Sequence, residues 1–478
     1  MRPRPANRSL PDALRGVLGD QGLVRDASRL ARYNTALWGH APGGAQLVMR
    51  PAHSAQTAEC VRLCSQYGTG IVPFGGATGF LGGQLAAQDG SEILLSLERM
   101  NSVRTIDTAS QCIVVDAGMT VAAVRDHALQ HGLTFPLRFG ADATAHIGGA
   151  LATNAGGMNA LRYGVARDLC LGLEVVLACG DTLSQLGTVR KDNTGYDLKQ
   201  IFIGSEGTLG VITAASLKLY PRPAAVTCAL VAMPNAAAAV DLLHLLSGRS
   251  DQRLCLFELM LRAAVMQATT LVPGCRSPFA NTPPAMALVE LEGSNEAELR
   301  GILESVLTEG LATGLVLDAA VAMSEAQRLA FWRLREALPE ANGRAGWVAS
   351  HDICLPIGKV PDYLTQLDAA LAARSDTHRA MVFGHLGDGN LHVTVVGGTS
   401  TGEDPNALEA ALSEAVLAPA IALGGSVSAE HGIGSEKVAL LARTETPTAL
   451  AMMCGLKNLL DPKGIMNPGK VLARTHSD

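Results

Sequence analysis

Helical and strand patterns of apolar residues alternate along the first part of the chain. The segment LPDALRGVLG from Leu10 and the segment SAQTAECVRLCSQYG that follows His53 have the 3.6-residue period of amphipathic helices. A further helical pattern runs from Thr120 to about His131. Strands are predicted for the apolar runs between these segments: Ile71–Val72, ILLSL from Ile93, and CIVVDAG ending at Gly118.

The pattern continues with a hairpin and then changes at a proline-rich segment. LEVVLACGDTLS reads as two strands with a turn at Gly180-Asp181. The strand VITAASLKLY ends at Pro221-Arg-Pro223, where we expect a domain boundary. Beyond it, the strands CALVAM and MALVELEG alternate with long Ala/Leu/Glu helices, and a mostly helical tail begins at about Val427. The predicted fold class is therefore α+β, with domains at 1–222 and 223–426 and a C-terminal helical segment, 427–478, that packs back on the first domain.

Composition supports a globular enzyme and excludes other classes. A chain of 478 residues suits two or three domains, and 48% hydrophobic against 17% charged residues indicates well-buried cores. The net charge of −6, without a Lys/Arg block, argues against a nucleic-acid partner. No apolar run approaches the ~18 residues of a membrane span.

Cysteine usage and the N-terminal residues bear on location. Ten cysteines are scattered without a CxxC pair, which favours a reducing cytoplasm. Arg2, Arg4 and Arg8 are followed by no apolar core of a signal peptide, so we expect none.

The 51 glycines cluster in a few loops, three of which lie in the first domain. These are Pro73–Gly83, Ile147–Gly157 and Gly204–Gly210. Glycine lets backbone N–H groups approach a pyrophosphate closely. Any one such loop is as well explained as a tight turn, but three in one domain favour a dinucleotide. The first loop lacks both the GxGxxG order of a nicotinamide site and the Gly-Lys-Ser/Thr of a nucleotide-triphosphate loop.

A second constellation lies in the segment Met381–Val396, which reads as strand, Asp-Gly turn, strand. This hairpin brings His385 and His392 close together across its mouth. Two imidazoles and a carboxylate with an open position suit a divalent ion, and Glu430 in SAEHGIG is the candidate carboxylate. The alternative for such histidines is polar surface or a satisfied core.

Together these motifs resemble a known family over about Leu47 to Val471. PFGGATGFLGG, IGGALATNAGG followed by RYG, and GSEGTLGVIT resemble the FAD-binding domain of the vanillyl-alcohol oxidase and p-cresol methylhydroxylase type. HLGDGNLH and SAEHGIG resemble the branch of D-lactate, glycolate and D-2-hydroxyglutarate dehydrogenases. The resemblance implies a two-subdomain FAD-binding domain, an α+β substrate-binding cap domain, and FAD as cofactor.

The resemblance also implies which residues contact FAD. They are Gly75, Gly76, Ala77, Thr78 and Gly79 in the first run, Thr144, Gly148, Gly149, Thr153, Asn154, Gly156 and Gly157 in the second, Glu206, Gly207 and Ile212 in the third, and Asn467 in the tail LLDPKGIMNPGKV. Ala77 replaces a usual glycine, so we expect an unstrained backbone there. No histidine lies within Pro73–Gly83 to form a covalent bond to the flavin, so we expect noncovalent FAD. His146 is the one candidate for such a bond in the second run, and a weak one. We expect Asn467 and Lys470 to pack the tail back against the flavin domain. A purely structural role is the alternative for Lys470.

For the chemistry, the family's metal ligands match His385, His392 and Glu430, and we expect zinc. The resemblance makes His431 the base that removes the 2-hydroxyl proton while the hydride passes to flavin N5. It also implies that Asn390 orients the substrate. Arg335, in WRLREALPEA, matches an arginine that binds a substrate carboxylate, although a solvated helix arginine is the alternative.

Two departures bear on the substrate. Relatives acting on D-2-hydroxyglutarate commonly have Ser or Thr four residues after that arginine and a lysine before the His/Tyr-Asp pair. Pro339 and Ser350 stand there in this chain, which favours D-lactate or another monocarboxylate and keeps D-2-hydroxyglutarate as an alternative.

Other readings stay open. An oxygen-using flavin oxidase of 2-hydroxy acids, like a glycolate oxidase subunit, has the same motifs. A catalytically silent flavin-binding subunit and a zinc hydrolase are further alternatives, against which the intact histidine set and the FAD loops argue. We expect a small 2-hydroxy acid as substrate, a flavoprotein, cytochrome or quinone as electron acceptor, and leave a homodimer open.

Overall fold

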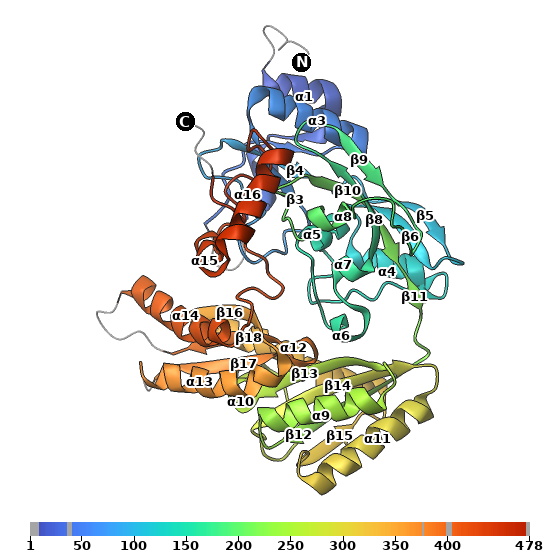
Figure 1. Ribbon diagram of the computed structural model, residues 1–478, viewed down its shortest axis with the longest axis vertical. Coiled ribbons are helices and arrows are strands. Elements are labelled where there is room, and N and C mark those ends of the chain that lie inside the picture. The colour runs from blue at the N-terminus through green and yellow to red at the C-terminus, as the bar shows by residue number, and fades with distance from the viewer. Residues whose placement is uncertain (1–8, 36–40, 375–376, 398–403, 475–478) are drawn as a thin grey trace. The chain divides into compact units, whose positions relative to one another are not determined.

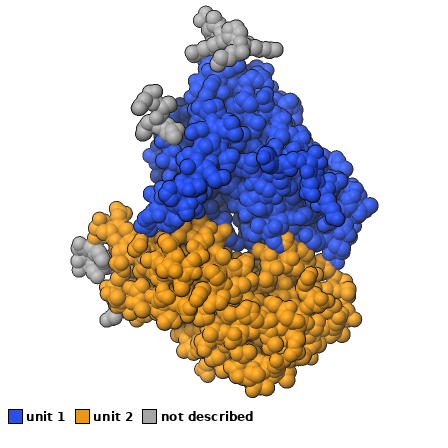
Figure 2. All heavy atoms as spheres, in the orientation of Figure 1, with its two compact units in different colours: residues 1–157, 164–222, 430–478 blue, residues 158–163, 223–429 orange. Residues whose placement is uncertain are grey.

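The computed structural model describes residues 9–35, 41–374, 377–397 and 404–474. Arg2, Arg4 and Arg8 lie outside the described residues. The chain forms two compact units, coloured separately in Figure 2. Unit 1 comprises residues 1–157, 164–222 and 430–478, and unit 2 comprises 158–163 and 223–429. The short segment 158–163 thus belongs to unit 2 although it lies inside the first predicted domain.

The first sheet of unit 1 has the strand order β1-β2-β4-β3 among the described residues, with β2, β4 and β3 parallel. The predicted amphipathic helix is α3, which ends at Gly68 in the left-handed conformation. The elements are α1 (Leu10–Leu18), β1 (Leu23–Val24), α2 (Ala27–Asn34), β2 (Val48–Met49), α3 (Ser54–Tyr67), β3 (Gly70–Phe74) and β4 (Glu92–Ser96). The predicted helices and strands of this region are therefore confirmed.

The second sheet of unit 1 is antiparallel, with the order β5-β6-β10-β8-β9 among the described residues. Strands β7 and β11 form a separate antiparallel pair. The predicted hairpin is confirmed as β8 and β9, which pair directly. The elements are β5 (Val103–Asp107), β6 (Cys112–Asp116), α4 (Val121–Leu129), β7 (Leu133–Thr134), α5 (Ile147–Ala152), α7 (Ala166–Leu169), β8 (Cys170–Val176), β9 (Thr182–Gln185), α8 (Lys199–Phe202), β10 (Val211–Lys218) and β11 (Tyr220–Pro221).

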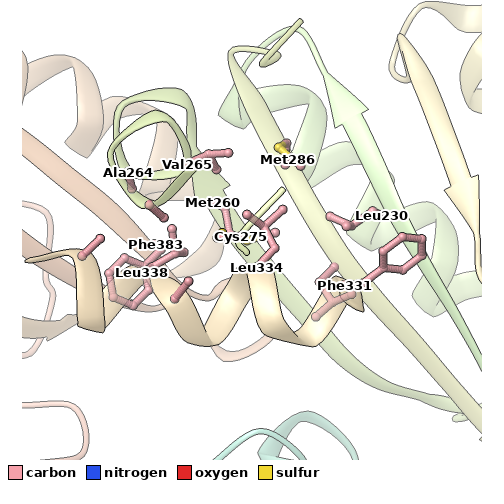
Figure 3. Close-up of a cluster of buried hydrophobic side chains, with 14 of the residues drawn as sticks. Leu230, Met260, Ala264, Val265, Cys275, Met286, Phe331, Leu334, Leu338 and Phe383 are labelled. Carbon is pink, nitrogen blue, oxygen red and sulfur yellow. The ribbon is translucent and has the colours of Figure 1, made fainter. Parts of the chain in front are cut away.

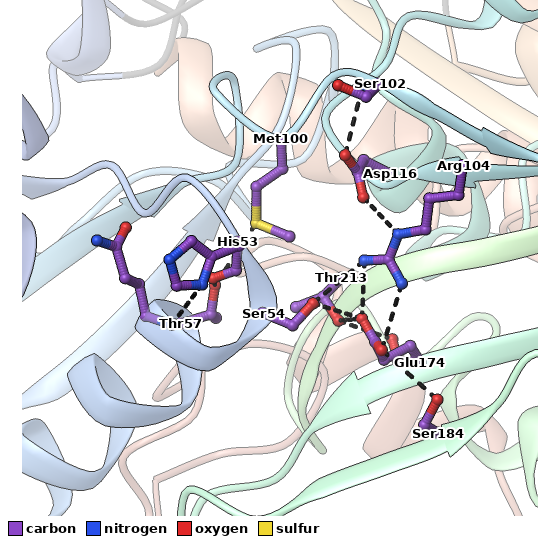
Figure 4. Close-up of polar contacts among 11 residues, drawn as sticks. His53, Ser54, Thr57, Met100, Ser102, Arg104, Asp116, Glu174, Ser184 and Thr213 are labelled. Atoms are coloured by element: carbon purple, nitrogen blue, oxygen red, sulfur yellow. Dashed lines mark hydrogen bonds and ion pairs between the residues drawn. The ribbon is translucent and has the colours of Figure 1, made fainter.

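A network of ion pairs and hydrogen bonds around the buried Glu174 joins the strands of this sheet (Figure 4). Arg104 on β5 donates to Asp116 at 2.7 Å and to Glu174 on β8 at 3.0 Å. Thr213 on β10 donates to the same Glu174 carboxylate at 2.9 Å, and Ser54 at the start of α3 also donates to it. The network satisfies a carboxylate that burial would otherwise destabilise.

The C-terminal segment of unit 1 is less helical than predicted. Its helices are α15 (Val438–Thr444) and α16 (Pro447–Leu460), whereas residues 427–437 and 461–474 form loops and turns. The tail extends the first sheet at β3, because Ile71 donates to Ile465 at 2.7 Å and Asn467 donates to Ile71 at 2.8 Å. The prediction of a helix from about Val427 was therefore wrong for the loop that carries Glu430 and His431.

Unit 2 contains an antiparallel sheet with the order β15-β12-β14-β13-β17-β18-β16 among the described residues. Helix α9 packs against α11 and α13, α13 packs against α14, and α10 packs against α12 (Figure 1). The elements are α6 (Ala160–Tyr163), β12 (Ala225–Met233), α9 (Ala236–Arg249), β13 (Leu254–Leu261), α10 (Arg262–Leu271), β14 (Ala285–Gly293), α11 (Glu296–Thr313), β15 (Asp318–Val321), α12 (Glu325–Ala345), β16 (Ala349–Cys354), α13 (Val360–Ala372), β17 (Arg379–His385), β18 (Asn390–Val396) and α14 (Pro405–Ala422).

The core between the sheet, α10 and α12 is apolar (Figure 3). Met260 on β13, Leu334 on α12 and Phe383 on β17 are buried in it. Burial of each such side chain contributes roughly 1.5–3 kcal/mol. This packing fixes α12, and with it Arg335, over one face of the sheet.

Two further findings bear on the sequence expectations. All ten cysteines lie among the described residues and are free thiols. Within the described parts of the chain, no helix combines the length and apolar character needed to cross a bilayer.

Candidate functional site

The three glycine-rich runs converge within unit 1. A Cβ on Gly76 in the first run would lie 2.0 Å from the carbonyl oxygen of Thr144, so only glycine allows this contact with the second run. The third run is hydrogen-bonded to the second, because the Gly204 N–H donates to Leu151 at 3.0 Å and the Glu206 N–H donates to Ala152 at 2.8 Å. Segments far apart in sequence thus form one set of loops.

Four of the predicted flavin-contacting residues have left-handed backbones without being glycine. Their φ values are +58° at Ala77, +49° at Asn154, +51° at Glu206 and +42° at Asn467. The prediction of an unstrained backbone at Ala77 was therefore wrong, because the turn requires the positive φ that the family's glycine supplies. Such residues cost of order 1–3 kcal/mol each and cluster at functional sites.

The loops contain room and buried polar atoms suited to a bound dinucleotide. A Cβ on Gly149 would meet no described atom within 4 Å. Among the described residues, the buried atoms Asn467 Oδ1 and His146 Nδ1 have no hydrogen-bond partner. A buried polar atom without a protein partner is a feature of sites that bind a ligand. Burial lowers the pKa of His146, which favours its neutral form.

The other predicted flavin-contacting residues hold the loops in shape. Thr153 donates to Gly149 at 3.0 Å, and Thr144 donates to Ala141 at 3.3 Å. The remaining ones lie in the same runs: Gly75, Thr78, Gly79, Gly148, Gly156, Gly157, Gly207 and Ile212.

Glu206 joins the third glycine run to the loop that carries Glu430 and His431. Its carboxylate accepts from the N–H groups of Ile433 at 2.7 Å and Gly434 at 2.8 Å. Burial raises the pKa of Glu206, against the effect of these donors. The Asn467 amide donates to the carbonyls of Gly83 at 3.0 Å and Glu206 at 2.7 Å. The tail signature therefore closes the loop set from the other side.

The Glu430-His431 pair lies against the glycine loops of unit 1. A Cβ on Gly156 would come within 2.8 Å of Glu430 Oε1, so the glycine makes room for that carboxylate. The ring of His431 stacks on Phe80 of the first run, with centroids 4.2 Å apart. The predicted base is thus positioned by the same loops as the predicted flavin site.

Lys470 has structural contacts. Its ammonium lies 3.5 Å from Glu92 at the start of β4, and Arg474 also pairs with Glu92. Burial lowers the pKa of Lys470, and Glu92 opposes that shift. Of the two roles considered for Lys470, its contacts are those of the structural one.

In unit 2, the predicted site residues share one face of the sheet. Cross-strand partners point to the same side, and the register pairs Glu258 with His385, Phe383 with His392, and His392 with Asp352. The predicted hairpin is confirmed, and the His385 and His392 ring centroids are 5.5 Å apart. Four neighbouring strands, β13, β17, β18 and β16, therefore present a row of polar side chains on this face. We call Glu258, His385, His392 and Asp352 the polar row.

Each histidine has a buried carboxylate at its Nδ1. Glu258 contacts His385 Nδ1, and Asp352 Oδ1 lies 3.4 Å from His392 Nδ1. An Nδ1 held in this way makes Nε2 the ligating nitrogen for a metal. The donor set therefore fits a divalent ion. Glu430 directly follows Ala429, whose N–H donates to the Asp352 carbonyl at 3.3 Å.

Arg335 reaches the same face from α12. Its Nε donates to Glu258 at 2.5 Å, and its guanidinium carbon lies 4.8 Å from the Phe383 ring centroid. Burial would raise the pKa of Glu258, but Arg335 and His385 outweigh it and hold that pKa well below its usual range. Arg335 is 9% exposed, so it is not the solvated helix arginine of the alternative reading.

Asn390 on β18 is hydrogen-bonded to the neighbouring strand β16 of the polar row. Its amide nitrogen donates to Asp352 at 2.6 Å and to the Ile353 carbonyl at 2.9 Å, while its buried Oδ1 has no partner among the described residues. Pro339 lies within α12 without ending it, and the Ser350 hydroxyl is 3.1 Å from that of Thr394.

Glu258 and Asp352 were not predicted as site residues. One signal was present for Glu258, because it is the single charged residue in the apolar strand LCLFELML. Asp352 belongs to the His-Asp pair that follows Ser350, but its contact with His392 depends on the register of β16 with β18.

Comparison with known proteins shows the family to which the chain belongs. Residues 45–184 match the FAD binding domain family, and residues 222–471 match the C-terminal domain of FAD linked oxidases. A mitochondrial D-2-hydroxyglutarate dehydrogenase of Rattus norvegicus is 38% identical over 94% of this chain and 82% of its own length. The D-2-hydroxyglutarate dehydrogenase of Stutzerimonas stutzeri (strain A1501) is 31% identical over 97% of this chain and 99% of its own length.

Among solved structures, p-cresol methylhydroxylase with substrate bound superposes with a TM-score of 0.76 at 16% identity, covering 98% of this chain and 97% of that one. That likeness confirms the predicted fold class. The family matches confirm the predicted FAD cofactor. The chain belongs to the FAD-linked oxidases, in the group that includes the D-2-hydroxyglutarate dehydrogenases, and is an FAD-dependent oxidoreductase.

Proposed function

We propose that the protein oxidises a D-2-hydroxy acid, in the first place D-2-hydroxyglutarate, to the 2-oxo acid. The observation that carries this is the polar row on the sheet of unit 2 together with Arg335, in which two histidines and an arginine are each oriented by a buried carboxylate. The curated relatives are named for D-2-hydroxyglutarate, which supports that acid as substrate.

In this proposal, Arg335 binds a substrate carboxylate through its guanidinium, because arginine matches the planar carboxylate. His385 and His392 hold a divalent ion through Nε2, with Glu430 as third ligand, and zinc suits these mixed nitrogen and oxygen ligands. His431 takes the 2-hydroxyl proton on an imidazole nitrogen. When bound, FAD supplies a hydride acceptor and the ion supplies a Lewis acid for the hydroxyl and carboxylate.

Noncovalent FAD is part of the proposal. The first glycine run contains no histidine, and His146 in the second is buried with a neutral ring favoured. We also keep the cytoplasm as the proposed location, supported by the ten free cysteines.

D-Lactate is the second candidate substrate. A specific observation favours it: Ser350 and Thr394 pair their hydroxyls on the face where relatives acting on D-2-hydroxyglutarate commonly have a lysine. Losing a cation from a site for a second carboxylate costs about 2 kcal/mol if nothing replaces it.

One experiment tests both. The purified flavoprotein is mixed anaerobically with D-2-hydroxyglutarate, D-lactate, D-malate and their L-enantiomers, and bleaching of the flavin absorbance is followed. We expect reduction by D-acids, fastest with D-2-hydroxyglutarate, and loss of reduction after exhaustive chelation that is restored by zinc. Reduction by L-acids alone, or by none of the set, contradicts the proposal; a preference for D-lactate would select the second candidate.

A further inference from the structure

Glu258 is a fully buried carboxylate in the otherwise apolar strand β13. A buried charge is strongly unfavourable unless it is paired. Glu258 uses both of its oxygens: Oε2 accepts from Arg335 Nε at 2.5 Å, and Oε1 contacts His385 Nδ1. One side chain therefore contacts both the proposed carboxylate-binding arginine and a proposed metal ligand.

These contacts fix the orientation of both partners. With Nδ1 directed to Glu258, the ring of His385 presents Nε2 to a metal. With Nε directed to Glu258 and its guanidinium over Phe383, Arg335 binds an external carboxylate through its terminal nitrogens. A change at Glu258 would consequently disturb both groups at once.

We propose that Glu258 is a positioning residue that couples metal binding at His385 to substrate binding at Arg335. The inference rests on the proposed function, because it assumes that His385 binds a metal and Arg335 binds substrate. It adds that the two sites share one carboxylate, so that metal affinity and substrate affinity fall together when this carboxylate is lost.

The same sheet provides a matched control. Glu290 on the neighbouring strand β14 is also buried and accepts from Arg328 Nε on α12 at 2.7 Å. Glu290 also accepts from the indole of Trp332, at 2.7 Å. Arg328 and Arg335 are seven residues apart on one helix, so the two ion pairs are alike in kind. Among the described residues, Glu290 makes no hydrogen bond or ion pair with the proposed metal or substrate residues.

The test compares Glu258→Gln with Glu290→Gln in the full-length flavoprotein. Metal-stripped protein is titrated with zinc against a chelating dye, and KM and kcat are measured by steady-state turnover of D-2-hydroxyglutarate with an artificial electron acceptor. FAD content and melting temperature are recorded for every variant. For Glu258→Gln we expect zinc affinity to fall about 10- to 100-fold, KM to rise about tenfold or more, and FAD content to stay unchanged. Glu290→Gln should lose stability and change neither affinity nor KM.

Equal zinc affinity and KM in Glu258→Gln and the parent protein would overturn the inference and leave the proposed function intact. A parent protein that neither binds zinc nor is reduced by D-acids would instead refute the proposed function, and the inference with it. If Glu258→Gln does not fold, Arg335→Lys is the second variant. The polar partner of Arg335 among the described residues is Glu258 and not a proposed metal ligand, so a several-fold loss of zinc affinity without substrate would support the coupling. An unchanged zinc affinity in that variant would refute it.

Discussion

The loops of unit 1 and the sheet face of unit 2 prepare their sites in different ways. In unit 1, the predicted flavin residues come from loops that are far apart in sequence, and several of them have left-handed backbones. In unit 2, the site residues lie on neighbouring strands of one sheet, and buried carboxylates orient their side chains. The first arrangement exposes backbone N–H groups and space, which suits a diphosphate; the second fixes side-chain ligands and cations.

This difference teaches where each site is vulnerable. A loop that depends on backbone conformation is altered by adding or removing a single Cβ. A sheet face that depends on paired charges is altered by removing one partner of a pair. Changes in the loops should therefore affect flavin binding first, and changes in the row should affect metal and substrate first.

The largest effect should separate chemistry from cofactor binding within unit 1. In His431→Ala, we expect flavin reduction by the D-acid to slow about 10²- to 10⁴-fold, because the proton acceptor is lost. FAD and zinc content should stay unchanged, since His431 belongs to neither predicted ligand set. Stopped-flow absorbance and elemental analysis measure these quantities, with the exposed His127→Ala as control. Loss of zinc together with activity would assign His431 to the metal site instead.

A smaller effect should show that open space in unit 1 receives the cofactor. Gly149→Ala places a methyl group where no described atom lies within 4 Å, in the middle of α5. We expect the apoprotein to gain roughly 0.5–1 kcal/mol, because alanine favours the helix, while FAD affinity falls about tenfold. Gly148→Ala is the matched control, since its Cβ would lie 2.9 Å from that of Ala117 and should destabilise the apoprotein itself. Unchanged FAD affinity in Gly149→Ala would place the cofactor elsewhere.

The smallest effect concerns strain in the first run. Ala77→Gly relieves a positive φ, and we expect a net gain of about 0.5–1 kcal/mol in the free energy of unfolding. FAD affinity should fall about two- to threefold, because a more flexible loop must be ordered on binding. Gln111→Gly, at φ +51° in the turn between β5 and β6, should gain stability without changing FAD affinity. A drop in FAD affinity in both variants would show that the effect is not local to the flavin loops.

Much of the architecture followed from local pattern. The period of apolar residues located α3, β4 and the hairpin β17–β18, because these elements are decided by side chains close in sequence. The tail helix was placed too early, since the loop with Glu430 and His431 is held by Glu206 and not by its own sequence. The positive φ of Ala77 could not be predicted from the sequence either, because it depends on how closely the first glycine run packs against the second.

The sequence by itself determined the fold class, the FAD cofactor and the residue types available for chemistry, because glycine runs and the HLGDGNLH hairpin are local signals. Only the tertiary structure decided which side chains share a carboxylate. Glu258 is 77 residues from Arg335 and 127 from His385 along the chain. Strand register alone brings Glu258 opposite His385, and packing of α12 on the sheet alone brings Arg335 to the same carboxylate. A buried charge is stable only where such distant partners meet, so the sequence shows the carboxylate and the fold shows its function.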